Sequence, residues 1–270
     1  MLKFTSIGDC VVDNYPDLNQ AFLGGSAFNV CLAARKLKVE TTLISAVGQD
    51  DWAKKYLSTC HKLSINSKFL AGFSGKTSHV SITLDQNHSP SYSKWQLGAL
   101  KLLKLTPNHQ EFFKTQTAVH CTAIKPLKLI LQQFSKLKLP GVFKSADFNG
   151  DTPYSFSAQD IPRYLSGLNL VSKSIGLKDT KSLNFLKNLA IKYHKIVLVT
   201  LGSSGSQVFT HNQTYFQPSI KTKPTDTTGA GDAYLATFIL NYLQTKNIPQ
   251  AMKQATQSAA EKITRLGASS

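Results

Sequence analysis

The stretch Asp226-Thr227-Thr228-Gly229-Ala230-Gly231-Asp232 runs directly into an apolar-periodic segment, Ala233 to Leu243. In that segment the apolar residues are spaced i, i+3, i+4, i+7 and i+8, which is typical of one buried helix face: Leu235, Phe238, Ile239, Tyr242 and Leu243. The spacing predicts that the glycines lie at a helix N-terminus. There the first backbone N–H groups lack intrahelical partners and the helix dipole adds partial positive charge, so an anion is favoured.

The residue types around this helix start suit phosphoryl transfer. Gly229, Ala230 and Gly231 carry little or no side chain, so a phosphate oxygen could approach the backbone closely. Asp232 follows in the first turn, where a carboxylate could take the proton of an attacking hydroxyl. The alternative is a capped helix whose Asp232 only complements the dipole.

The whole string closely resembles the signature of the ribokinase-like (pfkB) carbohydrate kinases. The resemblance implies an α/β fold, with a central, mostly parallel sheet flanked by helices and a small β lid. It also implies that residues 1–270 form a single kinase domain. In that family the last Asp of the string is the catalytic base, and the Gly-Ala-Gly amides form the anion hole. Here these would be Asp232 and the residues Gly229, Ala230 and Gly231.

A second group of candidate residues lies near the N-terminus. Asp9 and Asp13 are four apart in an extended segment, so they share a face and could bind sugar hydroxyls; an exposed, polar strand end is the alternative. Gly24-Gly25 precedes another helical pattern, and Asn29 lies one turn into it. A Gly pair before a helix alone indicates only a turn.

The Gly24-Gly25 pair, however, lies about 200 residues before the Gly229–Asp232 motif, a position that is similar to that of the family's N-terminal signature. The resemblance implies that Asp13, Gly24, Gly25 and Asn29 grip the sugar, and we add Asp9 to this set. The run from Ile7 to Gly25 resembles the fructoselysine 6-kinase branch of the family.

Two segments, about 10–23 and 67–93, are expected to form a small separate sheet. Val80, Ile82 and Leu84 alternate with polar residues, as in a strand with one wet face. In the family such a sheet is a lid over the sugar and often a dimer surface, so a homodimer through the lid is one expectation. We expect substrate discrimination on its polar face, at Lys76, Ser78 and His79. The alternative is a surface hairpin without ligand contact.

Beyond residue 93 the pattern alternates between strands and helices, which predicts a parallel sheet covered on both faces. The expected strands are Ala118–Ala123, Val142–Asp147, Leu168–Ser172 and Ile196–Leu201. Ligands gather at the carboxyl ends of such strands. The loop at Thr200, Gly202 and Gly205 resembles the family's nucleotide-contacting loop, and Thr227 completes the expected nucleotide neighbours. A plain turn is the alternative.

Composition excludes several other classes of protein. The formal net charge is +16, but the lysines are scattered without an aromatic-interleaved stripe, so a solvated basic surface is preferred to nucleic-acid binding. No apolar run has the length of a signal peptide or a membrane span, which favours a cytoplasmic protein with no membrane partner. The four cysteines and seven histidines lack zinc spacing, and no P-loop motif is present.

Together these patterns predict an ATP-dependent sugar kinase acting on a primary hydroxyl of a fructose-type or fructosamine substrate. ATP and Mg²⁺, as MgATP, are the implied cofactors. The rival hypothesis is a non-catalytic sugar or nucleotide sensor; retention of Asp232 argues against it. One departure from the family concerns the metal. Many members carry an Asn-x-x-Glu element, where this chain has Lys173-Ser174-Ile175-Gly176-Leu177-Lys178-Asp179. Lys173 or Lys178 could neutralise phosphate there, with Asp179 as a displaced acid; the metal ligands stay unassigned.

Overall fold

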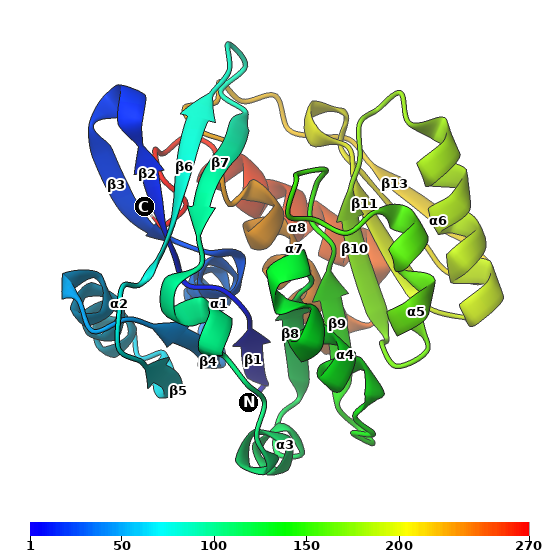
Figure 1. Cartoon of the computed structure of the whole chain (residues 1–270). Helices are drawn as coiled ribbons and strands as arrows, with labels where there is room; N and C mark the ends of the chain where they lie inside the picture. The colour runs from blue at the N-terminus through cyan, green and yellow to red at the C-terminus, as the bar shows by residue number, and fades with distance from the viewer. Residues whose placement is uncertain (270) are drawn as a thin grey trace.

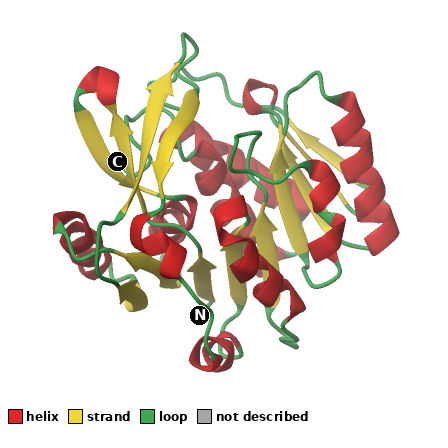
Figure 2. Ribbon diagram, in the orientation of Figure 1, coloured by secondary structure: helices red, strands yellow, loops and turns green. Residues whose placement is uncertain are grey.

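The computed structural model describes residues 1–269, which fold around a nine-stranded central sheet with the order β13-β12-β11-β10-β9-β8-β1-β4-β5 (Figures 1 and 2). The strands from β11 to β5 pair in parallel, and β12 and β13 form an antiparallel hairpin at one edge. In chain order, the strands of this sheet are β1 (Lys3–Ile7), β4 (Glu40–Val47), β5 (Asn66–Gly72), β8 (Ala118–Thr122), β9 (Phe143–Asp147), β10 (Leu170–Ser174), β11 (Ile196–Thr200), β12 (Ser206–Phe209) and β13 (Thr214–Gln217).

The central strands are buried almost without interruption, because helices cover both faces of the sheet. One core layer packs α1 (Ser26–Lys36), α7 (Ala230–Thr245) and α8 (Ile248–Lys262) on the sheet. The remaining helices are α2 (Asp51–Lys62), α3 (Pro107–Phe113), α4 (Lys128–Lys136), α5 (Pro162–Leu165) and α6 (Thr180–Tyr193); α4, α5 and α6 cover the other face. The predicted alternation and the α/β fold class are thereby confirmed.

Helix α7 is the central helix of its layer, since it contacts both α1 and α8. Its residues from Asp232 to Leu240 are all buried, and not only the face with the periodic apolar residues. The helix begins after Gly229, which adopts a left-handed conformation (φ 79°). Glycine does so without the steric cost that a Cβ would bring. The predicted helix start at the glycines is therefore confirmed, and the helix that follows the motif is fixed in the core of the protein.

A second, four-stranded sheet stands over the carboxyl ends of the central strands (Figure 1). Its order is β3-β2-β6-β7, built from β2 (Val11–Tyr15), β3 (Gln20–Gly24), β6 (Ser78–Leu84) and β7 (Pro90–Gln96). The expected boundaries of its second segment, 67–93, need correction. β5 pairs with β4 in the central sheet, so the small sheet resumes at Ser78 and continues to Gln96.

Candidate active site

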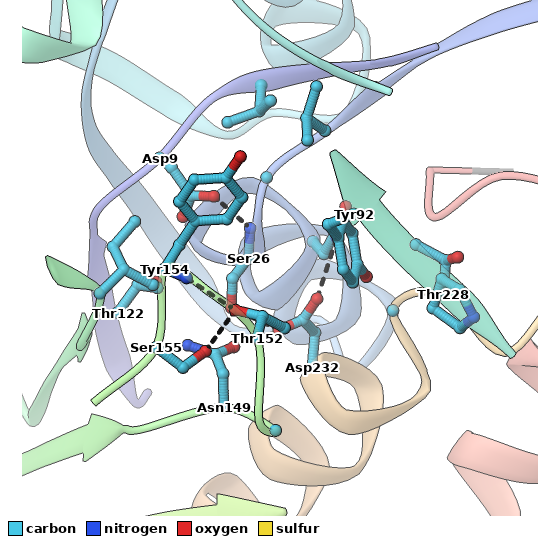
Figure 3. Close-up of a pocket in the computed structure, with 18 of the residues that line it drawn as sticks. Asp9, Ser26, Tyr92, Thr122, Asn149, Thr152, Tyr154, Ser155, Thr228 and Asp232 are labelled. Atoms are coloured by element: carbon cyan, nitrogen blue, oxygen red, sulfur yellow. Dashed lines mark hydrogen bonds between the residues drawn. The ribbon is translucent and has the colours of Figure 1, made fainter. Parts of the chain in front are cut away.

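A cavity of about 400 Å³ lies between the two sheets. Side chains at the carboxyl ends of β1, β8, β9 and β10 form its floor, because parallel strands present these ends at one edge of the sheet: Asp9, Thr122, Asn149 and Ser174. Residues of the small sheet and of the start of α7 complete the lining, among them Asp13, Val80, Tyr92, Trp95, Gly229 and Asp232 (Figure 3). The two motifs of the sequence thus meet in one cavity, although they are about 200 residues apart.

Asp232 lies in the first turn of α7, where two side chains of α1 hold its carboxylate. Ser26 Oγ donates to one oxygen at 2.5 Å, and Asn29 Nδ2 donates to the other at 2.9 Å (Figure 3). Burial raises the pKa of Asp232 to about 7, although these two hydrogen bonds oppose the rise. Asp232 is therefore a fixed carboxyl group that can exchange a proton near neutral pH.

Asp9 fixes the start of α1. Its two carboxylate oxygens accept the backbone N–H groups of Ser26 (3.1 Å) and Ala27 (3.3 Å), the first amides of the helix. Gly25 is needed beside it, because a Cβ there would lie 2.4 Å from the Asp9 carbonyl oxygen. Burial raises the pKa of Asp9. Through Ser26, Asp9 thereby positions one of the two donors to Asp232, in addition to lining the cavity.

Asp13 reaches the cavity from β2 and packs against Gly24 of the neighbouring strand. A Cβ on Gly24 would lie 2.0 Å from a carboxylate oxygen of Asp13, so only glycine fits there. Asp13 is 4% exposed, and its pKa is raised well above the usual range, first by burial and then by the charge of Asp9. Four of the five predicted substrate residues line the cavity, and Gly24 makes room for one of them.

The backbone beyond Gly229 is only partly free to bind a ligand, because the Ala230 N–H already donates to the Thr227 carbonyl oxygen at 3.2 Å. A Cβ on Gly231 would meet no atom within 4 Å, so space remains beside the first turn of α7. Thr227 is tied to the small sheet: its backbone N–H and its hydroxyl both donate to the His88 carbonyl oxygen, at 3.1 and 3.2 Å. The β6–β7 hairpin therefore contacts the motif directly, a link that sequence spacing did not indicate.

Only one of the four residues expected to contact the nucleotide lines the cavity. Thr227 lines it, whereas Thr200, Gly202 and Gly205 lie beyond it, at the end of β11. Thr200 Oγ1 shares a hydrogen bond of 2.6 Å with the hydroxyl of Ser174, which does line the cavity. Gly205 has φ 99°, and a Cβ there would lie 2.2 Å from the Gln217 carbonyl oxygen, so its turn closes tightly on β13.

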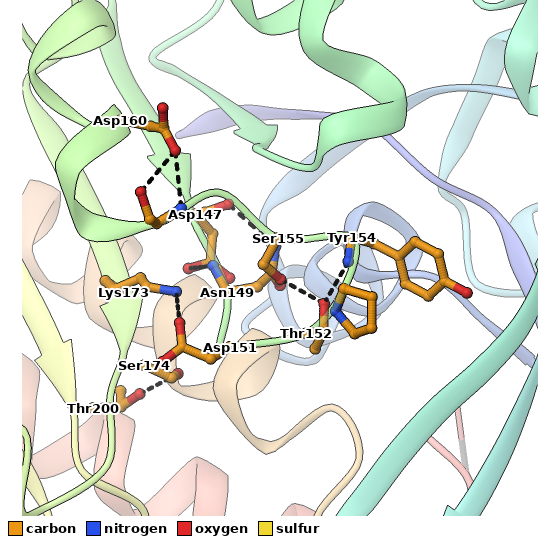
Figure 4. Close-up of polar contacts among 12 residues, drawn as sticks. Asp147, Asn149, Asp151, Thr152, Tyr154, Ser155, Asp160, Lys173, Ser174 and Thr200 are labelled. Atoms are coloured by element: carbon orange, nitrogen blue, oxygen red, sulfur yellow. Dashed lines mark hydrogen bonds and ion pairs between the residues drawn. The ribbon is translucent and has the colours of Figure 1, made fainter.

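Lys173 and Asp151 form an ion pair at the ends of β9 and β10, with Lys173 Nζ 2.8 Å from Asp151 Oδ1 (Figure 4). The lysine side chain is 1% exposed and the aspartate 72%. Lys173 was a candidate because it begins the run that stands where the family has its Asn-x-x-Glu element; Asp151 gave no signal in the sequence. Asp179, considered as a displaced acid, instead caps α6 by accepting the N–H of Ser182 at 3.0 Å. Asp179 is absent from the cavity lining.

The side chains of β6 and β7 that face the cavity are apolar and aromatic, contrary to the expectation for the polar face of β6. Val80, Tyr92 and Trp95 line the cavity, together with Tyr154 from the loop after β9. The Trp95 and Tyr154 rings meet edge to face, with centroids 4.8 Å apart. His79 points the other way, since neighbouring strand residues alternate, and it bonds Asn14 at 3.3 Å. Val80, Tyr92 and Trp95 face the cavity because that face of the small sheet is the buried one.

The described residues 1–269 contain no cluster of three or more His, Cys, Asp or Glu side chains that could hold a metal ion. Within the same residues no helix has the length and apolar character needed to cross a bilayer.

Comparison with known proteins defines the class. The family model for "pfkB family carbohydrate kinase" matches residues 11–270. The chain belongs to this family of carbohydrate kinases. The chain is 26% identical to the fructosamine kinase FrlD of Bacillus subtilis, over 99% of this chain and 93% of that protein. It is 25% identical to the fructoselysine 6-kinase of Escherichia coli, over 99% of this chain and the whole of the relative.

Solved structures show the same fold. A sugar kinase of Pyrococcus horikoshii, PH1459, solved in complex with ATP, superposes with a TM-score of 0.78 at 20% identity, covering 98% of this chain and 94% of that chain. A ribokinase of Thermotoga maritima gives a TM-score of 0.78 at 18% identity, covering 100% and 95%. The ribokinase-like fold expected from the sequence is confirmed.

Proposed function

We propose that this carbohydrate kinase transfers the γ-phosphoryl group of ATP to a primary hydroxyl of a fructosamine or fructose-type sugar, with Asp232 as the general base. The observation that carries the proposal is the fixed carboxyl of Asp232, held by Ser26 and Asn29 in the first turn of α7 beside the open backbone at Gly231. The names of the two relatives supply the substrate class.

The chemistry needs one proton transfer and one bond exchange. The substrate hydroxyl gives its proton to Asp232, its oxygen bonds to the γ-phosphorus, and the bond to the leaving oxygen breaks to release ADP. A base with a pKa of about 7 combines a large deprotonated fraction with useful basicity at neutral pH. The amides of Gly229 and Gly231 would stabilise the charge on the transferring group, aided by the helix dipole, and the Ala230 amide would join them once it leaves the Thr227 carbonyl oxygen.

The sugar would lie between Asp232 and the small sheet. Asp13 and Asp9 would accept its hydroxyl donors, Gly24 and Gly25 would allow the backbone to approach it, and Asn29 would orient both the base and the sugar. The aromatic residues Tyr92, Trp95 and Tyr154 provide an apolar wall for a substituent on the sugar.

The nucleotide would lie toward the ends of β10 and β11, near Thr200, Gly202, Gly205 and Thr227. Magnesium would arrive with ATP and neutralise phosphate charge, since it needs only one or two carboxylates in addition to phosphate oxygens. This fits the donor set, because the described residues offer no converging carboxylate cluster. A magnesium titration should therefore show that activity requires the metal. Calorimetry without nucleotide should show no micromolar site.

The test is a panel of fructoselysine, other fructosamines, fructose, ribose and nucleosides, each offered with MgATP, with ADP formation as the readout. The proposal expects the highest kcat/KM for a fructosamine. Turnover of ribose or a nucleoside alone would leave the kinase assignment intact and refute the substrate class. Binding of sugar and ATP without any ADP formation would favour the sensor alternative.

A further inference from the structure

A buried carboxylate lies directly behind the start of α7. Asp226 is 0% exposed and three residues before Gly229. Three donors converge on it, as suits a carboxylate charge: the Tyr15 hydroxyl at 2.7 Å, and the N–H groups of Thr228 at 2.8 Å and Gly267 at 2.9 Å. A negative charge at this depth would repel an anion at the helix start, because screening by water is weak in the interior.

A buried ammonium group lies on the same side of the helix start. Lys262, the last residue of α8, is 7% exposed, and its Nζ donates to the Gly267 carbonyl oxygen at 2.8 Å. Gly267 therefore connects Lys262 to Asp226 through its own C=O and N–H groups. A Cβ built on Gly229 would lie 3.5 Å from Lys262 Cε, so the lysine lies beside the residue that precedes α7.

Direct ion pairing does not explain why this lysine is buried. Lys262 belongs to none of the ion pairs found in residues 1–269. Burial lowers its pKa, while the negative charges of Asp226 and Asp232 oppose that shift and the nearby Lys36 and Arg265 add to it. A lysine taken out of water at this cost needs a compensating role.

We propose that Lys262 is the built-in counter-charge of the phosphoryl-binding end of α7, which offsets Asp226 and holds the Gly229 backbone in position. This rests on the proposed kinase function. Lys262 would act through Gly229 and Asp226 and is a positioning residue. Without its charge, the buried carboxylate would weaken the anion hole, so the loss would fall on turnover and not on sugar binding.

A four-member cycle tests the proposal: the wild type, Asp226→Asn, Lys262→Met and the double variant. Lys262→Met should lower kcat by about tenfold or more, which corresponds to about 1.4 kcal/mol in the activation barrier, with the KM of the sugar within about twofold. The double variant should turn over faster than Lys262→Met alone, because it removes both charges. Lys36→Met is the matched control, an exposed neighbouring lysine whose loss should leave kcat unchanged.

A chemical rescue tests whether a small ammonium donor can replace the lysine side chain. Lys262, Gly229 and Ala268 line a second cavity of about 610 Å³, which gives small amines a route to the vacated position. Methylammonium should raise the kcat of Lys262→Ala, and tetramethylammonium, which cannot donate a hydrogen bond to Gly267, should not. A purely structural lysine would show neither the rescue nor the recovery of turnover in the double variant.

Wild-type kcat in Lys262→Met, or a double variant no faster than Lys262→Met, would overturn the proposal. If Lys262→Met does not fold, the double variant provides the test. The proposal then requires that the double variant folds and that its kcat equals that of Asp226→Asn. The wild type and Lys36→Met report separately on the proposed function. If neither phosphorylates any sugar, that function fails, and the unfolding midpoints across the cycle still measure the coupling of the two charges.

Discussion

The two sides of Asp232 are built differently. On the proposed sugar side, Asp9 and Asp13 are almost fully buried, and Asp9 is hydrogen-bonded to the first amides of α1. On the proposed nucleotide side, the acidic residue is Asp151, 72% exposed and held by one lysine. The sugar side is thus preformed within the core, whereas the nucleotide side is open. The difference suggests that changes on the sugar side alter binding and chemistry strongly, and changes on the nucleotide side do so weakly.

The largest expected effect lies where the two sides meet. Asp232→Asn should lower kcat by roughly 100-fold or more, the usual scale for a lost general base, with sugar and ATP affinity within a few-fold. Steady-state kinetics and calorimetry measure these quantities. Asp179→Asn is a matched control, since this carboxylate only caps α6. Normal turnover in Asp232→Asn would show that Asp232 is not the general base, and the two sides could then no longer be defined by their position relative to it.

A folding defect can be distinguished from a catalytic one. Because the folded-state pKa of Asp232 is raised to about 7, its contribution to stability is present at low pH and is lost as pH rises through 7. Asp232→Asn should therefore unfold at a temperature no lower than the wild type at pH 8. Low activity with a lowered midpoint would indicate damage to the fold.

The next effect concerns the sugar side alone. Asp13→Ala should weaken sugar binding by at least about tenfold, the cost of removing a charged hydrogen-bond partner, while ATP affinity stays within twofold. Calorimetry with each ligand provides the measurement. Equal losses for sugar and ATP would show that the two sides have been assigned incorrectly. Asn29 is a less clean probe, because its amide also holds Asp232.

The smallest effect is expected on the nucleotide side. Lys173→Met should raise the KM for ATP by about threefold to tenfold, because a charge-assisted contact to phosphate is lost, with kcat for the sugar step little changed. Asp151→Asn removes the partner and leaves the lysine available, so it should not raise the KM for ATP. An ATP KM unaffected by Lys173→Met would limit the ion pair to a structural role in the loop after β9.

The sequence indicated the surroundings of Asp9 and Asp13 better than the pairing in the loop after β9, for a physical reason. Gly24, Gly25 and Gly229 are required by close backbone approaches, and such requirements leave fixed residue types at fixed spacing. The pairing of Lys173 with Asp151 depends on where a loop returns, which spacing does not encode. Residues 67–72 were assigned to the small sheet for a similar reason. A strand pattern does not specify which sheet the strand joins, and β5 pairs with β4 in the central sheet.

The pH dependence of kcat/KM for the best sugar tests the role of Asp232 most directly. The base must be deprotonated to act, and burial sets its pKa at about 7. Between pH 5 and 7, kcat/KM for the wild type should therefore rise by roughly tenfold per pH unit, and then level off above pH 7. The residual activity of Asp232→Asn should lack this slope. A wild-type rate independent of pH over this range, or the same slope in Asp232→Asn, would contradict the assignment of Asp232 as the base.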